Sequence, residues 1–232
     1  MSIQESLKNF PARSALYLKK LSQNNNREWF EANRDLYNAD FLEPAIQFVV
    51  EMGERLLQLS PDIHAIPKID KSIFRIHRDV RFSKNKEPYK TNMGLLFWEG
   101  PGKKMEKSGY YFHLEPKGFG VGAGMYMFTK DHIKKFRDTI ADSVKGKELS
   151  SVVKKITKSS LYSINGKNFK KTPRGYDPDS KYAEFFLYNG IYSWYDGQNF
   201  DELKKGNPVD IVFRKFKDMA PLHKWLVKNI LS

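Results

Sequence analysis

Apolar residues in the first third of the chain recur at helical spacing. Leu16, Leu18 and Leu21 fall near one face of a predicted helix within residues 12–21. A second helical segment follows Asn26, a residue typical of an N-cap. The clearest helix is predicted from residue 43 onward, because Pro44 suits a first helical turn and Pro61 ends the pattern. Its apolar stripe is expected to contain Ile46, Val49, Val50, Leu56 and Leu57.

The middle of the chain has the alternation that is typical of strands. In residues 73–79, Phe74 and Ile76 would point to one side and Arg75, His77 and Asp79 to the other. Three further strands are predicted at residues 91–98, 109–115 and 118–128. The last two are joined by a short turn and should form a hairpin. We therefore predict a central antiparallel sheet of about four or more strands within residues 72–128.

The last predicted strand contains a row of glycines. If residues 118–128 are extended, Gly118, Gly120, Gly122 and Gly124 lie on one face. Glycines in a strand pack no side chain of their own, so another group must approach this strip closely. The row can be explained by tight packing or by strong twist of the strand. It can also be explained if the strip forms the floor of a ligand groove. The sequence leaves both interpretations open.

The last third returns to helical patterns. Helices are predicted at residues 131–144 and 147–159, followed by an irregular segment, a short helix within 181–189 and a strand at 191–195. Two more helices are expected around Pro221. Strands clustered between helical ends indicate an α+β fold flanked by N-terminal and C-terminal helices. Since no linker or repeat interrupts the 232 residues, we expect one domain spanning 1–232.

Composition and charge narrow the class of protein. Lysine and arginine number 40 against 27 acidic residues, giving a formal charge of +13, which favours encounter with polyanions. There is no cysteine, so disulfides, thiol nucleophiles and cysteine-ligated zinc are excluded. The chain shows no secretory signal and no run of about 18 apolar residues, so we expect a cytoplasmic protein without a membrane partner.

The cations are concentrated between residues 75 and 90. This window holds six of them, Arg75, Arg78, Arg81, Lys84, Lys86 and Lys90, against the acids Asp79 and Glu87. Arginine offers a planar fork and lysine a point charge for phosphate. A tyrosine there could add a hydroxyl or stack on a base. The predicted ligand-binding residues are Arg78, Arg81, Lys86, Tyr89, Lys90 and, from a rigid turn elsewhere, Arg174.

Acid–base chemistry has three candidate residues. They are Asp79, His77 and His113, of which the two histidines could share a sheet face with Glu115 nearby. No histidine pair has helical metal spacing, and no Walker loop or nucleophile elbow occurs. We therefore expect neither a metal nor a cofactor.

The sequence also resembles a known family. The stretch FRIHRDVRFSKNKEPYKTNMG closely resembles the core motif of the domain of unknown function 2461, found in bacteria and fungi. NNNREWFEANRDLY, GYYFHLEPKGFGVGAGMY and KKTPRGYD extend the resemblance over nearly the whole chain. It implies a single-domain protein with these segments at its centre, and it implies no reaction. Ser180 and Lys181 stand where a His-Pro-like pair is expected.

Three functions are compatible with these features. The leading hypothesis is a domain that binds a phosphate-bearing ligand, nucleic acid or nucleotide, through the Arg/Lys/Tyr loop. The alternatives are a hydrolase or transferase acting on such a substrate, and a scaffold protein in which the arginines form an internal network. An exposed basic surface with accessible aromatic side chains would favour nucleic acid.

Overall fold

The computed structural model describes residues 3–232, and side chains from residue 10 onward. The predicted α+β class is confirmed, because helices at both ends flank a six-stranded antiparallel sheet of order β1-β2-β3-β4-β6-β5 within these residues. The strands are β1 (Ile63–His64), β2 (Met93–Glu99), β3 (Gly109–Leu114), β4 (Phe119–Met125), β5 (Tyr162–Lys167) and β6 (Tyr188–Gly197).

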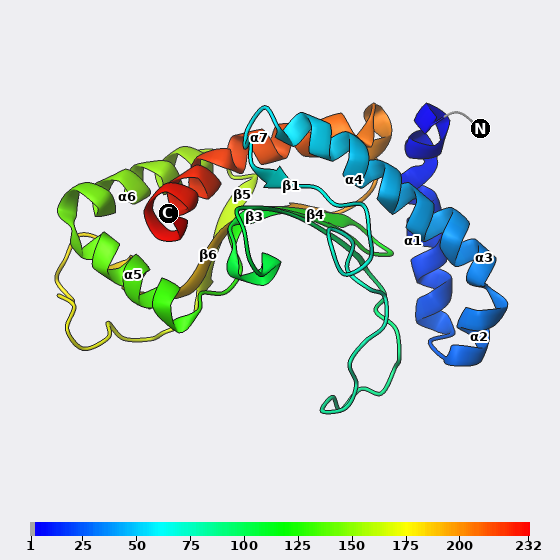
Figure 1. The fold of residues 1–232 in the computed structure, drawn as a ribbon, viewed down its shortest axis with the longest axis horizontal. Coiled ribbons are helices and arrows are strands. Elements are labelled where there is room, and N and C mark those ends of the chain that lie inside the picture. The colour runs from blue at the N-terminus through cyan, green and yellow to red at the C-terminus, as the bar shows by residue number, and fades with distance from the viewer. Residues whose placement is uncertain (1–2) are drawn as a thin grey trace. The chain divides into compact units, whose positions relative to one another are not determined.

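The helices follow the predicted segments closely at the N-terminus (Figure 1). Asn26 caps α2 by accepting a hydrogen bond from the Trp29 amide at 2.8 Å, and Pro44 lies in the first turn of α4. The helices are α1 (Ile3–Gln23), α2 (Arg27–Ala32), α3 (Arg34–Tyr37), η1 (Asn38–Leu42, a π-helix), α4 (Glu43–Leu56), η2 (Lys104–Glu106, 3-10), α5 (Lys130–Ala141), α6 (Ser143–Thr157), η3 (Ala183–Leu187, 3-10), η4 (Leu203–Lys205, 3-10), α7 (Pro208–Leu226) and η5 (Val227–Leu231, π).

Residue packing divides the chain into two compact units, each built from three segments. Unit 1 comprises residues 1–97, 111–121 and 196–214, and unit 2 comprises 98–110, 122–195 and 215–232. In unit 1, aromatic rings stack between α1, α4 and β3, with Phe48 against Phe112 at 4.9 Å and Phe10 against Phe48 at 5.4 Å. All three rings are fully buried. Burial of such large apolar rings is the main stabilising contribution in a core of this kind.

Two details of the predicted helices are wrong. Val50 and Leu57 are about half exposed, whereas Phe48 and Met52 are fully buried, so the apolar stripe of α4 is rotated from the predicted one. Helix α7 continues through Pro221 instead of breaking into two helices. A proline removes one helical hydrogen bond, and a helix tolerates this when tertiary packing holds the turns on both sides.

The strand predictions are confirmed for β2, β3, β4 and β6. Residues 73–79 do not form a regular strand. They meet β2 only through an isolated antiparallel bridge between Ile73 and Leu95, with Phe74 donating to Gly94 at 3.0 Å. The edge strand next to β2 is the two-residue β1 instead. Strand β5 was missed, because residues 162–167 show no clear alternation.

The glycine row is filled by protein. A methyl group on Gly118 would lie 2.4 Å from the carbonyl oxygen of Gly197, and one on Gly122 would lie 2.9 Å from the Trp194 ring. Gly124 has a φ of +134°, which side-chain-bearing residues rarely adopt. The row therefore serves close packing of β6 on β4, and these three positions leave no room for a ligand.

Candidate functional site

The cationic window forms a stem and a loop in unit 1. Ile76 and Lys90 pair through a backbone hydrogen bond of 2.8 Å, and Arg78 donates to the Pro88 carbonyl at 2.8 Å. We call the two paired segments, residues 76–78 and 88–90, the stem, and residues 79–87 between them the cationic loop. It contains no helix or strand and projects from the sheet between β1 and β2 (Figure 1).

Asn25 anchors the stem to the helical part of unit 1. Its side-chain amide donates to the Tyr89 carbonyl at 3.0 Å, and its side-chain oxygen accepts from the Tyr89 amide at 3.0 Å. One asparagine thus satisfies both backbone groups of a residue 64 positions away. This contact fixes where the cationic loop leaves the protein.

Tyr89, predicted to contact a ligand, packs instead in the core of unit 1. Its side chain is 3% exposed and stacks on Phe30 with ring centroids 4.3 Å apart and an interplanar angle of 18°. The His77 ring lies 5.0 Å from Tyr89 and 5.7 Å from Phe30. These rings hold the stem against α2, and one face of Tyr89 is covered by Phe30.

The two arginines predicted to bind a ligand from residues 75–90 both have acidic partners. Arg81 forms a bidentate contact with Asp79 at 2.7 and 2.9 Å, and the pKa of the Asp79 carboxyl is held below its ordinary value by these hydrogen bonds. Arg78 lies 3.8 Å from Glu87 and donates to the Ser83 hydroxyl at 3.3 Å. Asp79 is therefore engaged as a carboxylate, and acid–base chemistry there would require this pair to open.

The remaining cations of residues 75–90 differ in whether protein groups already engage them. Lys86 donates to the Val80 carbonyl at 3.0 Å, and Lys90 donates to the Arg75 carbonyl at 2.9 Å. Burial lowers the pKa of Lys90, and the charge of Arg75 lowers it further. The side chains of Arg75 and Lys84 are exposed and form no ion pair within the described part of the chain. These two cations are the ones most open to an incoming anion.

Sequence reasoning missed the most exposed aromatic side chain of the loop. Phe82 is 95% exposed, and the Arg81 guanidinium carbon lies 5.9 Å from its ring centroid. Leaving a whole phenylalanine ring in water forgoes about 1.5–3 kcal/mol of burial. The available signal was an aromatic residue flanked by cations in a polar loop, RFSKNK.

A row of polar and aromatic side chains runs along one face of β3 in unit 1. The Tyr111 hydroxyl lies 3.2 Å from His113 Nδ1, and His113 Nε2 lies 3.8 Å from the Glu115 carboxylate. Tyr111 packs edge-on against Phe74, over which the Lys90 ammonium lies at 5.7 Å. The row thus connects two predicted residues, Lys90 and His113, and its hydroxyl and imidazole could exchange a proton.

His113 should make the stability of the protein depend on pH. Burial lowers its pKa from the ordinary 6.5, although Glu115 partly opposes this. The unfolded chain therefore takes up the proton first as pH falls below about 6.5, and the folded state loses stability through the window down to the depressed pKa.

We expect His113→Gln to lose less stability than the natural sequence as the pH falls below about 6.5. Urea unfolding at several pH values measures the difference, with Lys84→Gln as a control that has no imidazole to titrate. Parallel stability curves for His113→Gln and the natural sequence would contradict a depressed pKa at this position.

Arg174 lies in unit 2. It occupies the predicted turn, in which Tyr176 donates to the Pro173 carbonyl at 3.4 Å and Gly175 has a φ of +92°. Its side chain is exposed. The predicted contact of Arg174 with an anion stays a prediction.

Within residues 3–232 the chain has no helix with the length and apolar character needed to cross a membrane. The same residues contain no group of three histidine or acidic side chains that could hold a metal ion.

The fold and the loop define an α+β protein that carries a projecting basic loop on a single sheet. The chain belongs to the family described as conserved hypothetical protein (DUF2461), whose model matches residues 13–225. Searches of the curated proteins and of the solved structures gave no significant match.

Proposed function

We propose that this protein binds single-stranded nucleic acid through the cationic loop of residues 79–87 together with the nearby Arg75. In this proposal the Phe82 ring stacks on a base, while Arg75 and Lys84 contact backbone phosphates. Proteins that bind single strands combine aromatic platforms with cations in this way, and each base stack contributes about 1–3 kcal/mol.

The observation that supports the proposal best is the exposure of Phe82. The ring is 95% exposed, beside the Arg81 guanidinium and two residues before the unpaired Lys84. A base could therefore reach the ring without any rearrangement of the core. A formal charge of +13 adds a long-range attraction for polyanions.

The arginine pairs fit the same proposal. Arg81 with Asp79, and Arg78 with Glu87, stiffen the loop and lower the conformational entropy lost on binding. In a scaffold protein these ion pairs would be sufficient to hold the loop in place, and an exposed phenylalanine would have no role there. The exposed ring thus favours the proposed function over a purely structural one.

The test is Phe82→Ala, measured by fluorescence anisotropy with a labelled oligothymidine at fixed salt. Loss of one base stack should weaken binding by about 1–3 kcal/mol, whereas Phe82→Trp should retain it. The melting temperature should stay nearly unchanged, because the ring contributes almost nothing to the core.

Lys84→Gln tests the phosphate contact in the same assay. The slope of log affinity against log salt should become shallower by about 0.7. The matched control is Lys154→Gln, an exposed lysine of helix α6. Equal effects of Lys84→Gln and Lys154→Gln would indicate diffuse attraction and refute a binding site on this loop.

A further inference from the structure

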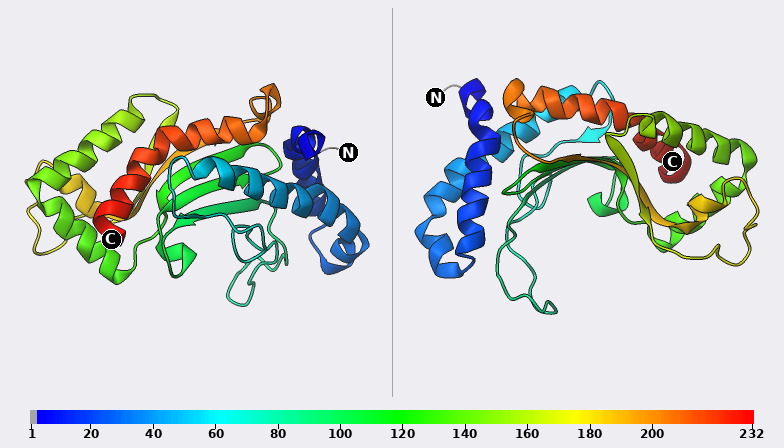
Figure 2. Two further views of the ribbon diagram at one scale, coloured as in Figure 1. Left: turned by 45° about the horizontal axis from the view of Figure 1, so that its top comes forward. Right: turned by 180° about the vertical axis from the view of Figure 1, so that it is seen from behind.

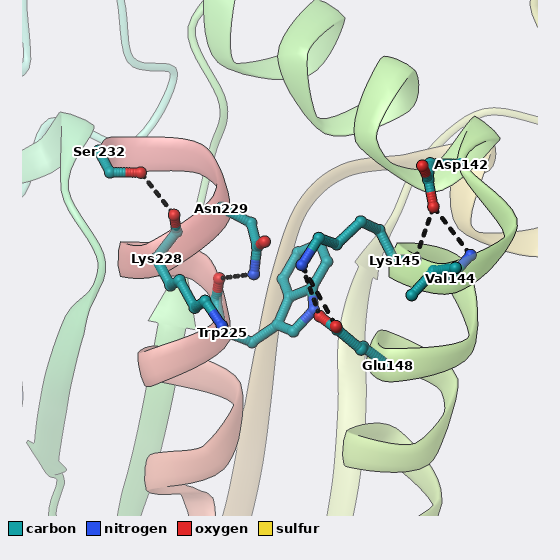
Figure 3. A network of polar contacts seen from close by, with 8 residues as sticks. All are labelled: Asp142, Val144, Lys145, Glu148, Trp225, Lys228, Asn229 and Ser232. Atoms are coloured by element: carbon teal, nitrogen blue, oxygen red, sulfur yellow. Dashed lines mark hydrogen bonds and ion pairs between the residues drawn. The ribbon is translucent and has the colours of Figure 1, made fainter.

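A groove of about 540 Å³ opens in unit 2, remote in sequence from the cationic loop. One wall is the face of α6 from Val144 to Val152. The other wall is the end of α7 with the following η5, from Pro221 to Asn229. Figure 2 shows these helices in the second half of the chain, and Figure 3 shows the two walls from close by. The volume lies in the range of sites for small organic ligands.

The groove has an apolar lining and a cationic rim. Val144, Val152, Pro221 and the Trp225 ring supply apolar surface, and Val144 is 63% exposed. Three exposed lysines also line the groove, Lys147 from one wall and Lys224 and Lys228 from the other. Such a combination suits a ligand with an apolar body and an anionic group.

The charges around the groove favour an anion. Glu148 is its one acidic lining residue, and Lys145 neutralises it through contacts of 3.1 and 3.2 Å. Lys147, Lys224 and Lys228 form no ion pair with any residue that the structure describes. Three like charges around one groove repel one another, and an anion between them would relieve that repulsion.

The indole of Trp225 provides a second, independent observation. Its side chain is 6% exposed, its Nε1 is buried, and no acceptor for the Nε1–H exists within the described residues. Figure 3 shows the ring reaching toward α6, with its nitrogen toward the Lys145–Glu148 pair, of which Glu148 lines the groove. A buried N–H without a partner costs about 1–3 kcal/mol.

The surrounding backbone is fixed in place. The Asn229 side chain donates to the Trp225 carbonyl at 2.8 Å, and Asp142 caps α6 by accepting from the Val144 and Lys145 amides at 2.8 and 3.0 Å (Figure 3). The Trp225 ring also packs edge-on against Phe136 at 6.2 Å. The indole is therefore held beside the groove by its neighbours, and a ligand oxygen reaches its buried N–H when a neighbouring side chain turns aside.

We infer that this groove binds a small organic anion, in which an apolar chain or ring lies along α6 and a carboxylate or monophosphate lies among the three lysines. An oxygen of the anionic group accepts the Trp225 Nε1–H. The site uses none of the residues proposed to contact nucleic acid, so the two proposals stand or fall separately.

The first experiment compares four ligands by isothermal titration calorimetry on the full chain. Octanoate and octyl phosphate have the same chain length and different anionic groups, whereas 1-octanol lacks the charge and octylammonium reverses it. We expect one or both anions to bind at least tenfold more tightly than octanol and octylammonium not to bind. The stronger of the two anions identifies the head group.

Two variants locate the binding. Lys224→Gln with Lys228→Gln, on the α7 and η5 wall, should weaken binding of the anion at least tenfold. Lys154→Gln with Lys155→Gln, on helix α6 but outside the groove, should change that binding less than twofold. Trp225→Phe removes the N–H donor. It should weaken binding of the anion several-fold and leave binding of octanol unchanged.

Each result decides the inference. Equal binding of octanoate, octyl phosphate and octanol would overturn it, as would equal effects of the two lysine pairs. The lysine pairs lie on exposed surface, so their result remains decisive even if Trp225→Phe lowers the melting temperature.

Discussion

Replacing His223 with leucine should lower the free energy of unfolding by about 3–5 kcal/mol. The His223 side chain is fully buried in unit 2, with Nε2 2.7 Å from a Glu99 carboxylate oxygen and Nδ1 2.9 Å from the Ser108 hydroxyl. Leucine has a similar apolar volume and no donor or acceptor. The mostly buried carboxylate and hydroxyl would each lose this partner, which is the costly part of breaking a buried polar pair.

Urea unfolding at neutral pH measures this loss. His132→Leu is the matched control, because His132 is half-buried and its Nδ1 has no hydrogen-bond partner in the described residues, so its loss should cost less than about 1 kcal/mol. In a double-mutant cycle, Glu99→Gln should cost much less in the His223→Leu background than alone. Additive losses would show that the two side chains are not coupled.

Replacing Tyr89 with alanine should destabilise unit 1 by about 3–5 kcal/mol. The ring is 3% exposed and stacks on Phe30 at 4.3 Å, so alanine would leave a cavity beside α2. Tyr89→Phe keeps the stack and should change stability by less than about 1 kcal/mol. Thermal unfolding followed by circular dichroism gives both values.

The same pair of variants separates structure from ligand binding. If Tyr89 acts through the core, Tyr89→Phe should retain affinity for the oligothymidine. A stable Tyr89→Ala protein with lost affinity would reverse this view and return Tyr89 to the ligand contacts predicted from the sequence.

The elements that the sequence predicted well are those specified by local interactions. The Asn26 cap, the position of Pro44 and the alternation of Tyr110, Phe112 and Leu114 in β3 all depend on residues a few positions apart. The turn between β3 and β4 is similarly local, with Glu115 donating to the Gly118 carbonyl at 3.0 Å. Local patterns of this kind can be read directly from spacing.

The incorrect predictions concern segments whose conformation depends on distant neighbours. Residues 73–79 alternate like a strand, yet they pair with β2 only at isolated positions, because the stem is held by Asn25 and by the ring of Phe30. Pro221 signals a helix break, yet α7 continues through it. In both cases tertiary contacts override local propensity.

The sequence alone determined that the cations of residues 75–90 lie together, since they are neighbours along the chain. Only the tertiary structure decided which side chains of this window remain accessible: Tyr89 is buried against Phe30, whereas Phe82 is left in water. The groove beside Trp225 and the contact of His223 with Glu99, 124 residues apart, have no sequence signature. Burial and pairing depend on which surfaces packing brings together, and spacing along a chain carries no record of contacts between distant segments.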